Sequence, residues 1–116
     1  REQEEARDNM QLISKMVSGY KVAGIAGKEH EDDILHRETI SSFAIRNGLV
    51  FLHSLIPAKE TKLSVVSLKH PIRWSDFKIS TVVMGLFRKE DINLLFRLKI
   101  RLCNRGVDPM FNRFPL

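Results

Sequence analysis

The chain has 116 residues, of which 43% are hydrophobic and 28% charged, and it contains one cysteine. These values suit one domain with one core, and they exclude a collagen-like or low-complexity chain. A lone cysteine excludes an internal disulfide and a cysteine-based zinc site, and no uncharged apolar run approaches the roughly 20 residues of a membrane span. The net charge of +5 permits an acidic or nucleic-acid partner without requiring either. We therefore expect one cytoplasmic domain over residues 1–110, with 111–116 left as an unassigned tail.

Two helices are predicted in the first third of the chain. Residues 4–20 place apolar side chains at spacings of three and four, which is one helical face. This predicted face comprises Ala6, Met10, Ile13, Val17 and Tyr20. Gly24 and Gly27 interrupt the next stretch. Acidic residues then open the segment 29–42 and favour a second helix, because they complement the helix dipole.

The pattern changes to that of strands after residue 43. The turn pair Asn47-Gly48 precedes the apolar run 49–52, which predicts a buried strand. Residues 63–68 predict a second strand, which we expect His70-Pro71 to end because proline donates no ladder hydrogen bond. Residues 78–87 are rich in β-branched side chains and predict a central strand covered on both faces.

A third helix is predicted over residues 89–104, after a loop that contains Trp74. Its predicted buried face comprises Ile92, Leu95, Phe96, Leu102 and Cys103. On this reading Cys103 is a small core side chain rather than a reactive thiol. Helices precede a strand-rich centre and another helix follows it, so we expect the α+β class, or an α/β class with a mixed sheet.

Standard catalytic signatures are absent from the sequence. It has no glycine-rich phosphate loop, no zinc-protease helix motif and no hydrolase nucleophile elbow, which disfavours a nucleotide-dependent enzyme. Of the four histidines, His30, His36 and His70 read as solvated surface residues. His53 differs, because it stands where the apolar run stops and a polar loop begins. That position suggests a half-exposed imidazole at a sheet edge, and it leaves open both a capping or core role and a chemical one.

The residues that lead up to His53 carry a family resemblance. The segment from Arg37-Glu38 through Gly48 to His53 resembles the phosphorylation motif of enzyme IIA (EIIA) domains, mannitol/fructose type, of the bacterial sugar phosphotransferase system (PTS). The order continues through Pro71-Ile72-x-Trp74, so that the resemblance extends over about residues 4–105. It implies an α+β sandwich, with a mixed sheet of about five strands and helices on both faces.

The resemblance also implies a mechanism without a cofactor or metal. His53 would accept a phosphoryl group from the small carrier protein HPr, with one imidazole nitrogen kept free as the nucleophile. Arg37 would bind the phosphate oxygens through its planar fork. Read without the resemblance, Arg37 is a helix-surface residue paired with Asp33 four positions earlier. The motif makes Asn47 and Gly48 neighbours of the phosphate site.

Three positions depart from the family pattern. Leu52 replaces the usual proline, Ser54 replaces the usual glycine, and Asp91 stands where many members carry a second histidine. Ser54 could crowd the site or donate a hydroxyl. Asp91 could orient the His53 imidazole or repel the phosphoryl group, or it could be an ordinary acid at a helix N-terminus.

These departures favour the regulatory copies of the domain, which occur in transcriptional activators and antiterminators. In that case nucleic acid would be contacted only through other domains of a longer chain. Two alternatives remain open. One is a free transport component that passes the phosphoryl group to an EIIB partner. The other is a domain that binds a protein partner without phosphotransfer. Because these readings differ in whether phosphotransfer occurs, the sequence leaves enzymatic activity undecided.

Overall fold

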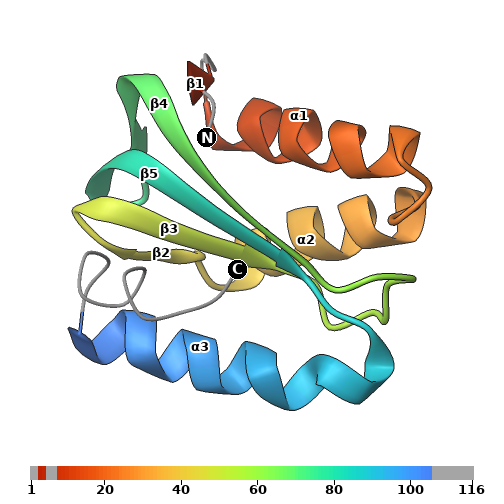
Figure 1. The fold of residues 1–116 in the computed structure, drawn as a ribbon. Helices are drawn as coiled ribbons and strands as arrows, with labels where there is room; N and C mark the ends of the chain where they lie inside the picture. The colour runs from red at the N-terminus through yellow and green to blue at the C-terminus, as the bar shows by residue number, and fades with distance from the viewer. Residues whose placement is uncertain (1–2, 5–7, 106–116) are drawn as a thin grey trace.

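A mixed β-sheet with helices on both faces forms the computed structural model, which describes residues 3–4 and 8–105 (Figure 1). The strands lie in the order β1-β4-β5-β3-β2. Their bounds are Gln3–Glu4 for β1, Ala44–Arg46 for β2, Gly48–His53 for β3, Lys62–Trp74 for β4 and Phe77–Leu86 for β5. The pairs β1–β4 and β3–β5 are parallel, whereas β4–β5 and β2–β3 are antiparallel. The predicted α+β class is confirmed, and because β1 has only two residues, four strands carry most of the sheet.

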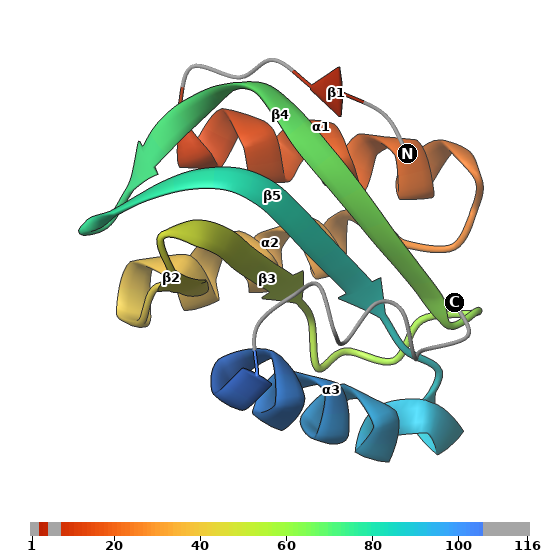
Figure 2. The same cartoon turned by 60° about the vertical axis from the view of Figure 1, so that its left-hand side comes forward.

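The helices divide between the two faces of the sheet, as Figure 2 shows. Helices α1 (Asn9–Val22) and α2 (Lys28–Ile40) cover one face. The short 3-10 helix η1 (Lys89–Asp91) leads into α3 (Ile92–Arg105), which covers the other face. Within residues 3–4 and 8–105, no helix combines the length and the apolar character needed to cross a membrane.

Strand β3 separates two apolar clusters. Its side chains alternate between the faces, so that Val50 and Leu52 pack in the cluster that contains α1 and α2. Leu49 and Phe51 pack instead with the buried leucines of α3. The same alternation assigns the His53 side chain to the α3 face. The strand period therefore decides that α3 forms one wall around His53.

The first helix begins later than its apolar pattern predicts. Asp8 caps α1, because its carboxylate accepts a hydrogen bond of 2.8 Å from the backbone N–H of Gln11. Upstream of this cap, Gln3–Glu4 pairs with β4 instead of extending the helix, and Ala6 lies outside the described residues. Met10 is consequently 37% exposed, and Leu12 belongs to the buried stripe. The second helix ends at Ile40 rather than at residue 42.

Strand β4 continues through His70-Pro71, where we expected it to end. Its register with β5 shifts between Ser67 and Ile72, and Pro71 lies within that irregularity. A proline is tolerated at a bulge because no regular ladder hydrogen bond is required there. Trp74 is therefore a fully buried strand residue rather than a loop residue, and the hairpin turns at Ser75, whose φ is +56°. The short strand β2, which is only half-buried, was not predicted.

The buried stripe of α3 differs in part from the predicted one. Leu95, Leu98 and Leu102 are fully or almost fully buried, at spacings of three and four. Phe96 is 47% exposed and Cys103 is exposed, because each follows a stripe residue by one position and is rotated about 100° from it. The prediction of a core role for Cys103 is therefore wrong. The expected boundary at residue 110 and the tail 111–116 lie outside the described residues.

Candidate functional site

His53 is the last residue of β3, where the carboxyl ends of β3 and its parallel neighbour β5 lie together. Ligands of open sheets with parallel strands commonly bind at this end of the strands. The side chain is 6% exposed, so it is buried and not half-exposed as its sequence position suggested. The position is nevertheless at the boundary between a buried strand and a loop, as expected.

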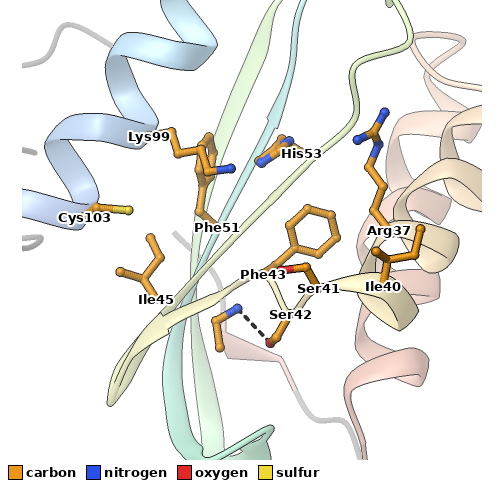
Figure 3. A pocket seen from close by; sticks show the side chains of 11 residues that line it. Arg37, Ile40, Ser41, Ser42, Phe43, Ile45, Phe51, His53, Lys99 and Cys103 are labelled. Atoms are coloured by element: carbon orange, nitrogen blue, oxygen red, sulfur yellow. Dashed lines mark hydrogen bonds between the residues drawn. The ribbon is translucent and has the colours of Figure 1, made fainter.

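The His53 ring lines a cavity of about 490 Å³ between the end of α2, the segment 41–45 and α3 (Figure 3). Two of the lining side chains are cationic, Arg37 from α2 and Lys99 from α3. Figure 3 shows them on either side of the imidazole. A cavity with a buried imidazole between two cations is suited to an anion, because nearby opposite charges compensate the loss of its hydration.

Aromatic packing holds the His53 ring. The ring of Phe43 meets it edge-on at a centroid distance of 5.0 Å and an angle of 80°, and Phe51 lies at 5.0 Å and 54°. The Nδ1 atom is fully buried and has no hydrogen-bond partner. Among the described residues, therefore, no acceptor fixes the ring proton on Nδ1, although the expected mechanism calls for one.

The environment of His53 favours a neutral imidazole. Burial, and after it the nearby charges of Lys99 and Arg37, lower the pKa of His53 from the ordinary 6.5 to about 4, while the charge of Asp33 acts in the opposite direction. The ring is thus neutral near pH 7. A neutral ring retains a lone pair on one nitrogen, which a nucleophile requires.

A hydrogen-bonded chain positions Arg37 beside the cavity. Its Nε donates to Oδ1 of Asp33 at 2.9 Å, which is the ion pair expected from the i−4 spacing. Ser54 is fully buried and its hydroxyl donates to Oδ2 of the same carboxylate at 2.7 Å. The serine at the family's glycine position therefore supports the ion pair. No hydrogen bond to a described residue engages the two terminal nitrogens of Arg37, which remain available to an anion.

Asp91 does not line the His53 cavity. Its carboxylate accepts hydrogen bonds from the Thr61 hydroxyl and from Nε of Arg88, the latter at 3.0 Å. Both interactions lower the pKa of Asp91. The structure thus places Asp91 in a bridge between the 54–61 loop and η1.

Asn47 and Gly48 lie at the opposite end of β3 from His53. At about 3.3 Å per residue, the strand separates Gly48 from His53 by roughly 16 Å. Asn47 accepts a hydrogen bond of 3.1 Å from the backbone N–H of Lys78, which anchors the start of the strand. The structure therefore does not bring these two residues to His53, because the turn that starts the strand lies at the other end of it.

Sequence reasoning also misjudged His30, which is buried and not solvated. Its Nδ1 accepts from the backbone N–H of Gly27 at 3.0 Å, and its Nε2 donates to the Pro57 carbonyl at 3.0 Å. Both ring nitrogens are thus used to join the start of α2 to the 54–61 loop. His36 and His70 are exposed, as predicted.

Two residues around His53 were not predicted as site residues. Lys99 was assigned to the solvated faces of its helix, and Phe43 to the start of the strand pattern. The i−4 spacing identified Asp33 only as a partner of Arg37. No local signal places Lys99 beside His53, because the two residues are joined only by the packing of α3 on the sheet. In the described part of the chain, no group of three or more His, Cys, Asp or Glu side chains could hold a metal ion.

Comparison with solved structures defines the class of domain. Nitrogen regulatory protein IIA-Ntr from Neisseria meningitidis aligns over 89% of this chain and 74% of its own, with a TM-score of 0.74 and 13% identity. IIA mannitol from Escherichia coli aligns over 90% of this chain and 86% of its own, with a TM-score of 0.68 and 14% identity. Similarity at this level establishes the fold of a IIA domain.

The family follows from sequence comparison. The family described as "Phosphoenolpyruvate-dependent sugar phosphotransferase system, EIIA 2" matches residues 1–104, so this chain belongs to it. The resemblance read from the motif around His53 is confirmed. Two curated relatives, both from Bacillus subtilis (strain 168), are transcriptional regulator ManR and the probable licABCH operon regulator. The first is 26% identical over 94% of this chain and the second 29% identical over 83%. The chain spans only 17% and 16% of their respective lengths.

Proposed function

We propose that this domain is a phosphohistidine module of the sugar phosphotransferase system and that His53 accepts a phosphoryl group from HPr. The observation that carries the proposal is the buried, neutral His53 imidazole in a cavity that also presents Arg37 and Lys99. Family membership supplies the class of reaction, and the cavity supplies a nucleophile and the charge to receive a phosphoryl group.

The transfer needs no nucleotide. The lone pair of His53 Nε2 forms a bond to phosphorus while the P–N bond to the donor imidazole breaks, and the donor leaves with that electron pair. Each imidazole keeps the proton on its other nitrogen, so atoms and charges balance. We assign the attack to Nε2 because Nδ1 is fully buried. Arg37, held through Nε by Asp33, presents its two terminal nitrogens to the phosphoryl oxygens.

We further propose that the module belongs to a transcriptional regulator and that phosphorylation of His53 reports sugar supply. Support comes from the two curated relatives, which are regulators far longer than this chain. A free transport component would instead pass the phosphoryl group on to an EIIB domain. The two roles are separated by incubating the phosphorylated domain with EIIB, since only the transport component is expected to lose its label rapidly.

The test is phosphorylation of the purified domain by phosphoenolpyruvate, enzyme I and HPr, followed by intact mass. We expect an acid-labile gain of one phosphoryl group that is absent in His53→Gln. His36→Gln is the matched control, because His36 is exposed and does not line the cavity. Retained labelling in His53→Gln would overturn the assignment. A folded wild-type domain that takes up no label from active HPr would instead indicate a protein-binding domain without phosphotransfer.

Arg37 gives a second, graded test of the same proposal. Loss of a preorganised donor at a developing charge commonly costs about 10²–10³-fold in rate, so Arg37→Ala should slow labelling by that order. Arg97→Ala is the control, because Arg97 is exposed on α3 and does not line the cavity. Equal labelling rates in the two variants would exclude Arg37 as a phosphate ligand.

A further inference from the structure

Arg37 alone does not neutralise the negative charge that a phosphoryl group would bring into the cavity. A phosphoryl group carries nearly two negative charges near pH 7. The Arg37 guanidinium is paired with the Asp33 carboxylate at 2.9 Å, and together they carry no net charge. Lys99 is the other cationic side chain that lines the cavity. The net positive charge of the site therefore resides on Lys99.

The ammonium group of Lys99 also has no partner among the described residues. No hydrogen bond or ion pair joins its ammonium group to any residue within 8–105, whereas Lys21 and Lys28 pair with Glu31 and Asp32. It projects from α3, on the side of His53 opposite Arg37 (Figure 3). An unpaired ammonium on a flexible stem, beside a buried imidazole, can follow an anion as that anion is transferred.

We propose that Lys99 is a second phosphoryl-binding residue, which contacts the phosphoryl oxygens from the α3 side while Arg37 contacts them from the α2 side. This inference rests on the proposed function. In the transfer to His53 Nε2, Lys99 gives up no proton and forms no covalent bond. It neutralises charge on the phosphoryl oxygens, both in the transition state and in the phosphorylated domain. The electrostatic influence of Lys99 on the His53 imidazole is consistent with this closeness.

The first experiment compares the rates of labelling by HPr in Lys99→Met, Lys99→Arg and Lys89→Met. Methionine keeps most of the apolar stem and removes the charge, arginine restores the charge, and Lys89 is an exposed lysine outside the cavity. We expect Lys99→Met to lower the maximal labelling rate by about 10²-fold, with Lys99→Arg close to wild type and Lys89→Met unchanged. An effect confined to the HPr concentration at half-maximal rate would overturn the inference, since it would mean that Lys99 contacts the carrier protein.

The second experiment needs no HPr. Inorganic phosphate is titrated into each protein while the His53 ring signals are followed by NMR. We expect phosphate to shift these signals in the wild type, and its apparent affinity to fall about tenfold in Lys99→Met. Unchanged affinity in Lys99→Met would overturn the inference, even if labelling were slower.

The two experiments separate the failure of each proposal. If wild type is not labelled but binds phosphate in a Lys99-dependent way, phosphotransfer fails and the Lys99 site stands. If Lys99→Met is labelled and binds phosphate like wild type, the Lys99 inference fails and the proposed function stands. If wild type neither takes up label nor binds phosphate, both fail.

Discussion

The buried, neutral His53 should make the stability of this domain depend on pH in a defined window. In the folded state, burial holds the pKa of His53 near 4, whereas in the unfolded chain the imidazole titrates near 6.5. Well above pH 6.5 the imidazole is unprotonated in both states. As the pH falls below 6.5, the unfolded state binds a proton at this imidazole and the folded state does not. The free energy of unfolding therefore decreases down to about pH 4.

The size of the effect follows from the two pKa values. At pH 5 the unfolded imidazole is almost fully protonated and the folded one is about one-tenth protonated, which costs about 2 kcal/mol of stability relative to pH 8. Below pH 4 the loss reaches its limit of about 3 kcal/mol. These losses are a substantial fraction of the net stability of a whole domain, which is roughly 5–15 kcal/mol.

The assay is urea denaturation of wild type and His53→Gln at several values between pH 4 and pH 8. Glutamine does not titrate, whereas the charged groups that face His53 are kept in both proteins: Arg37 and Asp33 from α2 and Lys99 from α3. The difference in unfolding free energy should therefore change by about 2 kcal/mol between pH 8 and pH 5, in the direction that disfavours wild type at low pH. A difference that does not vary with pH would refute the argument that burial excludes the proton from His53.

Three further substitutions test other parts of the structure. Leu102→Ala should lower the free energy of unfolding by about 2–5 kcal/mol, because the side chain is fully buried. Phe96→Ala should change it by only about 0.5 kcal/mol, because Phe96 is 47% exposed. If the two variants lost similar free energies of unfolding, Phe96 would belong to the buried face, as the sequence predicted. Asp33→Asn should lower the pKa of His53 below that of wild type, because the Asp33 charge raises it. NMR titration measures that pKa, and an unchanged or higher value would contradict the assigned electrostatics.

Much of the local structure was predictable because it depends on near neighbours in the chain. The spacing of apolar residues located α1 and α3, the acidic residues at its start located α2, and Asn47-Gly48 located the start of β3. The segment 78–87, which is rich in β-branched side chains and continuously apolar over residues 82–87, corresponds to β5, which is paired on both sides. The Arg37–Asp33 ion pair was also available, because residues four apart share a helical face. The ordered motif that ends at His53 was enough to indicate the family.

Predictions at element ends and on partly apolar faces failed where a distant contact decided the outcome. Pro71 would end an isolated strand, but a register shift against β5 carries β4 past it to a buried Trp74. Phe96 is as apolar as the leucines of α3, yet the packing of α3 on the sheet buries Leu98 instead. His30 has no local sign of burial, because the carbonyl that it binds belongs to Pro57.

The sequence by itself determined the three long helices, the three long strands, the α+β class, the family and the identity of His53 as the candidate acceptor. These depend on periodicity, on turn chemistry and on a contiguous motif, all of which are local. Only the tertiary structure separated Asn47 and Gly48 from His53 and brought Lys99 beside it. The physical reason is that strand length and helix packing set the distances between residues far apart in the chain, and the charge of the cavity is the sum of groups gathered in that way.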